Sequence, residues 1–162
     1  MTTSAGTAAP EQAITCSIPL RWGDMDAYGH INNVEVVRIL EEARIGAFGP
    51  PGGTGRPGRE PEVPFFSSLP AETQALVVEH RVKYKSSLEY RNIPLIAKVW
   101  VSDLKAASLA INYLLLDPVT DVVCVAAQSS IAFVSAESGR LQRISAGQKT
   151  MVAPYEATPV ME

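Results

Sequence analysis

The feature that most constrains the fold of this chain is one amphipathic helix followed by a series of strands. Between Asn33 and Phe48, apolar residues recur at spacings of three and four, which predicts a helix with one buried stripe. A strand with alternating apolar positions, from Ile14 to Trp22, precedes this helix. The later segments that favour strands lie at about 76–85, 93–101, 108–116 and 122–134. This order predicts an α+β domain built on an antiparallel sheet.

The chain is expected to form a single domain. Its 162 residues, 46% of them hydrophobic, suit one compact core. Residues 13–154 contain the periodic segments, and 1–12 and 155–162 are interpreted as a disordered N-terminal tail and a C-terminal tail. The Gly- and Pro-rich stretch 49–64 is expected to be a long surface loop, either a lid over a binding site or simply mobile.

Charge and composition argue against several classes of protein. A net charge of -3 gives no general attraction to nucleic acid or to an anionic membrane. No apolar run approaches the ~20 residues that span a bilayer, and the N-terminus lacks the features of a secretory signal. Cys16 and Cys124 lie within apolar alternation without metal-ligand spacing, so buried free thiols are expected. We therefore expect a cytoplasmic protein that needs no metal and no cofactor.

The stretch from Arg21 to Asn33 carries the chemistry. It places Asp24, Asp26 and His30 in a glycine-containing turn directly before the predicted helix. A helix N-terminus presents unpaired backbone N–H groups and a partial positive charge. A carboxylate beside such a terminus can attack a carbonyl or activate water while the N–H groups polarise the carbonyl oxygen. This combination indicates acyl chemistry.

Three segments of the chain also carry a family resemblance: Arg21–Asp26, Gly29–Asn33 and the helix end Leu40–Arg44. With them, residues 14–134 resemble the hotdog-fold acyl-CoA thioesterases, specifically the 4-hydroxybenzoyl-CoA thioesterase-like group. The resemblance implies an antiparallel sheet wrapped around one long central helix. It also implies hydrolysis of an acyl thioester to the free acid and CoA.

The same resemblance assigns roles to individual residues. Asp26 is the expected nucleophile or general base, and the sequence does not choose between the two. The backbone N–H of Asn33 is expected to hold the thioester oxygen, and His30 to act as a catalytic or orienting group. The expected substrate-binding residues in the motif are Tyr28, Gly29 and Asn32. Lys105 is expected to meet the CoA phosphates, with Ser108 nearby.

Other interpretations of these residues stay open. Asp26 can instead be the acceptor of an Asx-turn, and Asp24 is expected to be structural, paired with Arg21 or the turn. A hotdog hydratase or dehydratase would pair a histidine with a helix carboxylate from Glu35, Glu41 or Glu42. A non-catalytic acyl-CoA-binding domain could keep the same fold. A further histidine, His80, lies on the apolar face of a strand and is expected to be a hydrogen-bonded core residue.

One helix can cover only one face of the predicted sheet. The other face, rich in Val and Leu, would remain exposed in a monomer. A homodimer or homotetramer that pairs through a sheet edge or face is therefore expected. The other expected partner is the substrate, acyl-CoA or an acyl group on acyl carrier protein, with no nucleic acid and no membrane.

Overall fold

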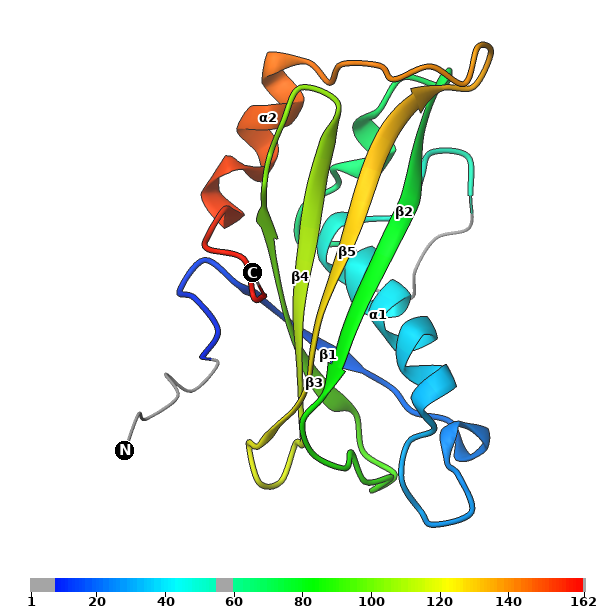
Figure 1. Cartoon of the computed structure of the whole chain (residues 1–162), viewed down its shortest axis with the longest axis vertical. Helices are drawn as coiled ribbons and strands as arrows, with labels where there is room; N and C mark the ends of the chain where they lie inside the picture. The colour runs from blue at the N-terminus through cyan, green and yellow to red at the C-terminus, as the bar shows by residue number, and fades with distance from the viewer. Residues whose placement is uncertain (1–7, 55–59, 162) are drawn as a thin grey trace.

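The fold is seen in a computed structural model that describes residues 8–54 and 60–161 (Figure 1). Five strands form one antiparallel sheet in the order β1-β3-β4-β5-β2. Their bounds are β1 Ile14–Ile18, β2 Thr73–Tyr84, β3 Leu95–Ser102, β4 Ser108–Leu116 and β5 Val123–Ser135. The α+β class and the existence of each predicted strand are confirmed. The first strand is shorter than expected, because the chain turns into the 3₁₀ turn η1 (Trp22–Asp24), where Trp22 is 76% exposed.

Helix α1 has the bounds expected from the sequence, Asn33–Phe48. Its buried stripe, which includes Ile39, Leu40 and Ala43, packs on the face of the sheet that we call the inner face. Gly49 ends the helix with φ +81°, and its N–H donates to the carbonyl of Ile45. In the view of Figure 1, α1 lies on the far side of the sheet.

The expectation of one long central helix enclosed by the sheet is met only in part. α1 has 16 residues and packs mainly beside β1 and β3. Three inner-face side chains of β2, those of Val77, His80 and Tyr84, remain exposed. One protomer therefore leaves the β2 side of its inner face uncovered, and we call this region the β2 flank.

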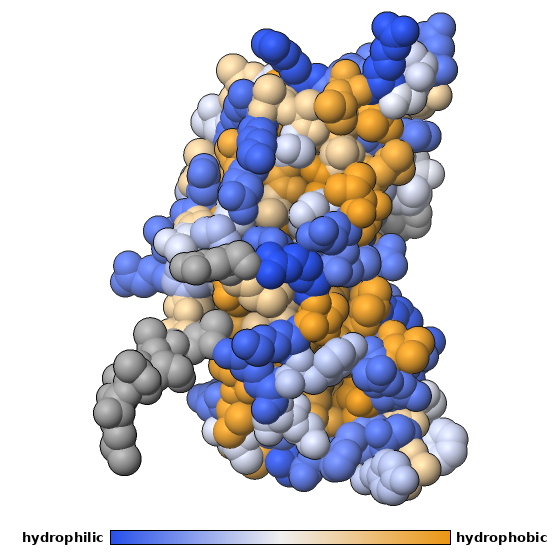
Figure 2. Space-filling model, viewed as in Figure 1, coloured by the Kyte–Doolittle hydropathy of each residue, from blue (hydrophilic) through white to orange (hydrophobic). Residues whose placement is uncertain are grey.

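Strand β2 also departs from the alternation expected for residues 76–85. The register against β5 shifts between Val77 and Glu79, which leaves Val78 as the extra residue of a β-bulge. Val77 and His80 are both on the inner face, opposite Ile131 and Ser129 of β5. The strand forms one edge of the sheet, and Val78 is 65% exposed there. Figure 2 shows hydrophobic surface along this side of the molecule, over β5 and β2.

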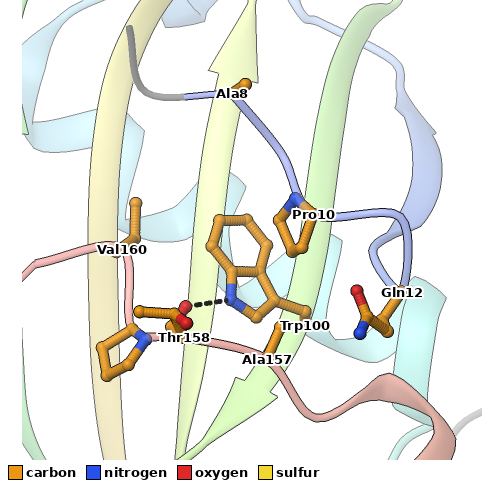
Figure 3. Close-up of a pocket in the computed structure, with 8 residues that line it drawn as sticks. Ala8, Pro10, Gln12, Trp100, Ala157, Thr158 and Val160 are labelled. Atoms are coloured by element: carbon orange, nitrogen blue, oxygen red, sulfur yellow. Dashed lines mark hydrogen bonds between the residues drawn. The ribbon is translucent and has the colours of Figure 1, made fainter. Parts of the chain in front are cut away.

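The outer face of the sheet is not left open, contrary to what the sequence predicted. After the short helix α2 (Ala146–Val152) and the 3₁₀ turn η3 (Ala153–Tyr155), residues 156–161 cross this face. The indole N–H of Trp100 donates to the carbonyl of Thr158 at 2.9 Å. Figure 3 shows the Trp100 ring between this segment and residues 8–12, at a hollow that both segments line. The segment expected as a C-terminal tail thus packs on the sheet.

A buried polar row completes the outer face. Asn112 donates to Ser102 Oγ at 2.8 Å and accepts from Gln128 Nε2 at 3.0 Å. Its Oδ1 also accepts from the backbone N–H of Val160 at 2.9 Å, which ties the C-terminal segment to the sheet. Because the amide is bonded on both sides, the row can be buried without unpaired groups.

The remaining expectations concern the cysteines, the N-terminal tail and the Gly- and Pro-rich loop. Cys16 and Cys124 are buried and are not joined in a disulfide, as predicted. The tail expected over 1–12 and the loop over 49–64 fall in part on residues 1–7 and 55–59, outside the described residues. Within the described part of the chain, no helix is both long and apolar enough to cross a membrane.

Candidate active site

The residues that carry the motif form a closed loop between β1 and α1. Met25 and Ile31 pair across it in an antiparallel bridge. The N–H of Asn32 donates to the carbonyl of Asp24 at 2.8 Å, which joins the two ends of the loop. Gly29 has φ +79°, a conformation that favours glycine, so the loop can reverse direction there.

Asp24 anchors this loop. Its side chain has no exposed surface and accepts from the backbone N–H of Arg21 at 2.7 Å, from the Arg21 guanidinium at 3.0 Å and from Arg38 Nη2 at 2.7 Å. Burial raises the pKa of Asp24, but the bonds from Arg21 and Arg38 outweigh it and hold the pKa below its ordinary value of 3.8. The structure therefore gives Asp24 the structural role, paired with Arg21, that the sequence indicated.

Asp26 occupies the inside of the loop. Its Oδ1 accepts from the backbone N–H of Tyr28 at 2.8 Å and of His30 at 3.1 Å. Its own N–H donates to the carbonyl of His30 at 2.7 Å. The Asx-turn interpretation is thus confirmed for one oxygen. The second oxygen, Oδ2, accepts no hydrogen bond from the described residues, so it is available to a substrate or a water molecule.

The start of α1 lies directly after this loop. Asn32 is the N-cap, and its Oδ1 accepts from the N–H of Val34 at 3.0 Å. The carbonyl of Asn32 accepts from the N–H of Glu35 at 2.9 Å and of Val36 at 3.2 Å. Of the first four N–H groups of the helix, only that of Asn33 has no acceptor among the described residues. It is the donor that the family resemblance assigned to the thioester oxygen.

The connection between β2 and β3 supports the loop from the side, and the sequence did not predict this. The N–H of Ile31 donates to the carbonyl of Leu88 at 2.7 Å, and the N–H of Tyr90 donates to the carbonyl of Gly29 at 3.1 Å. Leu88 is 4% exposed. Leu88, the one aliphatic residue in the stretch 86–92, was the available sequence signal of this contact.

Tyr84 is a second neighbour of the site that sequence reasoning missed. Its hydroxyl donates to the carbonyl of Asn33 at 2.8 Å, which joins the end of β2 to the first residue of α1. The candidate carboxylate, the free N–H and the β2 flank therefore meet at one end of the sheet, the lower end in Figure 1.

The other candidate residues divide into two groups. His30 lies in the loop with its backbone bonded to Asp26, and Tyr28 is 84% exposed beside it. Lys105 and Ser108 lie in the turn between β3 and β4, where the N–H of Lys105 donates to the carbonyl of Ser108 at 2.9 Å. This turn is at the opposite end of the sheet (Figure 1), about 25 Å away along β3. One protomer thus does not bring Lys105 and Ser108 to the motif, and their role stays a prediction.

The described residues hold no group of three or more His, Cys, Asp or Glu side chains arranged for a metal ion. The loop and the helix start offer one carboxylate oxygen and one helix N–H, and neither has a partner among the described residues. A carbonyl group that is attacked at its carbon and gains negative charge on its oxygen would use both the carboxylate oxygen and the N–H.

Comparison with protein families decides the membership of this chain. The family model described as the thioesterase-like superfamily matches residues 20–154, which includes the motif loop, α1 and the four later strands. The chain belongs to the thioesterase-like superfamily. No curated protein matches it significantly.

Several solved structures are similar to this chain in fold. The PA5185 protein from Pseudomonas aeruginosa is 22% identical, with a TM-score of 0.71 over 93% of this chain and 97% of that one. A thioesterase-superfamily protein from Jannaschia sp. CCS1 is 18% identical, with a TM-score of 0.72 over 93% and 98%. The 1,4-dihydroxy-2-naphthoyl-CoA thioesterase from Synechocystis is 11% identical, with a TM-score of 0.67 over 87% and 96%. At these identities the likeness establishes the hotdog fold and not a substrate.

Proposed function

We propose that the protein is an acyl-CoA thioesterase, which hydrolyses a thioester to a free acid and CoA. The observation that carries the proposal is the unpaired N–H of Asn33 at the start of α1, next to the loop that holds Asp26. Membership of the thioesterase-like superfamily supports it. A cytoplasmic location is part of the proposal.

The thioester carbonyl oxygen accepts a hydrogen bond from the Asn33 N–H, which strengthens as negative charge develops on that oxygen. Asp26 acts through Oδ2 in one of two ways. It attacks the carbonyl carbon and expels the CoA thiolate, leaving a mixed anhydride that water then hydrolyses. Alternatively it removes a proton from a water molecule that attacks the same carbon. In both cases Oδ1 stays bonded to backbone N–H groups and fixes the orientation of the carboxylate.

The neighbouring residues have supporting roles in this proposal. His30 orients Asp26 or the attacking water, and Tyr28, Gly29 and Asn32 line the approach of the thioester. Lys105 and Ser108 would have to come from another copy of the chain to meet the CoA phosphates, because they lie at the far end of their own sheet.

A homodimer formed along the edge strand β2 is part of this proposal. As an edge strand, β2 has a neighbouring strand on one side only and carries exposed apolar side chains, which a second copy can cover. A partner at this edge would also enclose the β2 flank and complete a binding cavity next to Tyr84 and Asn33. The α1 helices of the two copies would then be wrapped by a shared sheet.

The rival interpretation as a hydratase needs a free helix carboxylate, and Glu35 does not supply one. It accepts from Arg38 Nε at 2.9 Å and from Arg21 Nη2 at 3.3 Å. Glu41 and Glu42 lie on the exposed side of α1. Hydrolysis is therefore favoured over hydration.

Thiol release from benzoyl-, short-chain and long-chain acyl-CoA tests the proposal. We expect turnover of at least one thioester, lowered about 100-fold or more in Asp26→Asn. The matched control is Asp121→Asn, the same chemical change in an exposed turn between β4 and β5, and it should keep the native rate. Equal rates in Asp26→Asn and native protein would reject the role of Asp26. Binding of acyl-CoA without hydrolysis of any thioester would favour the non-catalytic alternative.

A further inference from the structure

The proposed donor to the thioester oxygen, the N–H of Asn33, lies at an exposed helix end. Asn33 and Val34, the first two residues of α1, are both exposed, and Val34 has 71% of its surface accessible. Packing against the core therefore does not hold this part of the helix in place. Helix ends also fray, because their first residues have fewer hydrogen bonds within the helix. A donor in this position keeps one orientation only if contacts from outside the helix support it.

Tyr84, the last residue of β2, supplies such a contact. Its hydroxyl donates to the carbonyl of Asn33 at 2.8 Å, the usual distance of an O–H···O hydrogen bond. A carbonyl oxygen has two lone pairs, so this bond can be added to the one that an α-helix makes along its axis. The sheet is thus joined directly to the residue that carries the proposed donor.

The peptide unit between Asn33 and Val34 is held at both of its polar groups. Tyr84 donates to its carbonyl oxygen, and its N–H, that of Val34, donates to Asn32 Oδ1 at 3.0 Å. Because a peptide unit is planar and rigid, these two bonds fix the orientation of the whole unit. The unit before it carries the unpaired N–H, and only the two backbone dihedrals of Asn33 relate the two planes. Fixing the one unit therefore restricts the direction of the N–H in the other.

Tyr84 can act as a fixed support because the sheet determines its position. It pairs with Val125 of β5, and the N–H of the next residue, Lys85, donates to the carbonyl of Cys124 at 2.8 Å. Val82 lies two residues earlier on the same face of the strand and packs against the core. The backbone of Tyr84 is thus anchored on both sides, and its hydroxyl carries that anchor to the helix.

The contact is suited to a positioning role more than to a stabilising one. Tyr84 is 51% exposed on the β2 flank, and Asn33 is exposed as well. If the hydroxyl were removed, water could bond to the Asn33 carbonyl, so no buried polar group would be left without a partner. Loss of the bond should therefore change the orientation of the helix start much more than the stability of the fold.

We infer that Tyr84 is a positioning residue for the proposed hydrolysis, which acts through the carbonyl of Asn33 to fix the N–H that holds the thioester oxygen. The inference rests on the proposed function, since it assigns a role to Tyr84 in the same reaction. The bond from the Asn33 N–H strengthens as negative charge develops on the oxygen, so its geometry matters most in the transition state.

Steady-state kinetics of Tyr84→Phe test the inference on the thioester that the native protein hydrolyses fastest. The variant keeps the ring and loses only the hydroxyl. We expect kcat to fall at least about tenfold while KM stays within about threefold, the pattern of an interaction lost in the transition state. Tyr155→Phe is the matched control and should keep both constants, because Tyr155 packs on Phe48 at the far end of α1. A kcat of Tyr84→Phe equal to that of the control would overturn the inference.

Backbone amide signals give a readout that needs no turnover. In ¹H–¹⁵N correlation spectra, the signals of Asn33 and Val34 should move in Tyr84→Phe and stay in place in Tyr155→Phe. The Tm of Tyr84→Phe should remain close to that of the native protein, which excludes unfolding as the cause of slow turnover. A fall in kcat without movement of these signals would also overturn the inference, because the effect would not pass through Asn33.

The two readouts separate the inference from the proposed function. If no thioester is hydrolysed and the signals still move, the proposed function fails and takes the role of Tyr84 in hydrolysis with it, while the support of Asn33 by Tyr84 stands. If thioesters are hydrolysed and Tyr84→Phe changes neither kcat nor the signals, the inference fails alone.

Discussion

Arg38 Nη2 lies 2.7 Å from Oδ1 of Asp24, a carboxylate with no exposed surface. This contact joins the first half of α1 to the turn η1, on the other side of the motif loop. Glu35 extends it, because its carboxylate accepts from both Arg38 and Arg21. The position of the loop that carries Asp26 relative to the start of α1 is therefore fixed by charged side chains that do not themselves take part in the proposed reaction.

Loss of the Arg38 guanidinium should destabilise the protein. Arg38→Met leaves the Asp24 carboxylate buried with one charged partner fewer, and we expect a loss of about 2 kcal/mol in the free energy of unfolding. Urea denaturation measures it. Arg143→Met is the control, since Arg143 is exposed and has no ion pair within the described residues. Equal losses in the two variants would contradict the anchoring role of the Asp24–Arg38 pair.

The pH dependence of stability should carry a contribution from Asp24. Its pKa is lower in the folded state than the ordinary 3.8, so its ionised form favours folding. That contribution is fully present above pH 3.8 and is lost as the pH falls through the lower folded-state pKa. Asp24→Asn should be less stable near neutral pH but lose less stability on acidification, as measured by urea midpoints between about pH 5 and pH 2.

Some acid sensitivity should remain in that variant. Burial raises the pKa of Asp117, but hydrogen bonds from Thr120, Val119 and Arg91 outweigh it and hold the pKa below 3.8. The ionised form of Asp117 therefore also favours folding, and its contribution to stability is also lost at low pH. If the urea midpoint of Asp24→Asn fell on acidification as steeply as that of the native protein, the contribution of Asp24 would be rejected.

Glycine should be required at position 29 for its backbone conformation and not for space. A methyl group added at Gly29 or at Gly23 would meet no atom within 4 Å, but only Gly29 has a positive φ, +79°. Gly29→Ala should therefore cost about 1 kcal/mol in the free energy of unfolding, and it should slow hydrolysis by shifting the loop around Asp26. Gly23→Ala should change both quantities much less. Denaturation and thiol-release assays on the two variants make the comparison.

The edge strand should be the contact between copies of the chain. Val78 on β2 is 65% exposed and Val119 in the β4–β5 turn is 62% exposed, so the two have nearly equal accessibility in one protomer. Val78→Lys should shift the protein toward a monomer, because a lysine on an edge strand opposes pairing. Val119→Lys should leave the mass unchanged. Light scattering after size-exclusion chromatography measures the mass, and a monomeric native protein would rule out the proposed dimer.

The elements that could be predicted from the sequence are those with strong local patterns. The apolar stripe from Asn33 to Phe48 predicted the helix bounds as the structure has them. The polar turn before it contains the carboxylate and the helix N–H that were expected to lie close together. Local spacing determines these features, because residues a few positions apart are held together by the chain itself.

The features that were missed depend on contacts between distant segments. Tyr84 reaches Asn33 across 51 positions, and Trp100 reaches Thr158 across 58. His80, which the sequence placed in the core, is hydrogen-bonded to Ser129 but exposed. The pairing of β2 with β5, which brings Ser129 opposite His80, could not be predicted from periodicity, because the order of antiparallel strands is set by the whole sheet.

The bulge in β2 gives this strand one residue more than its ladder requires. Removing Val78 would leave every other β2 side chain on the face it now occupies, since Val77 and His80 are both on the inner face already. Removing Val82 instead would move the residues that follow it to the opposite face, Tyr84 among them. Natural variation in chain length within β2 should therefore be tolerated at one position only, and a homologue shorter by one residue there would keep the same contact between Tyr84 and α1.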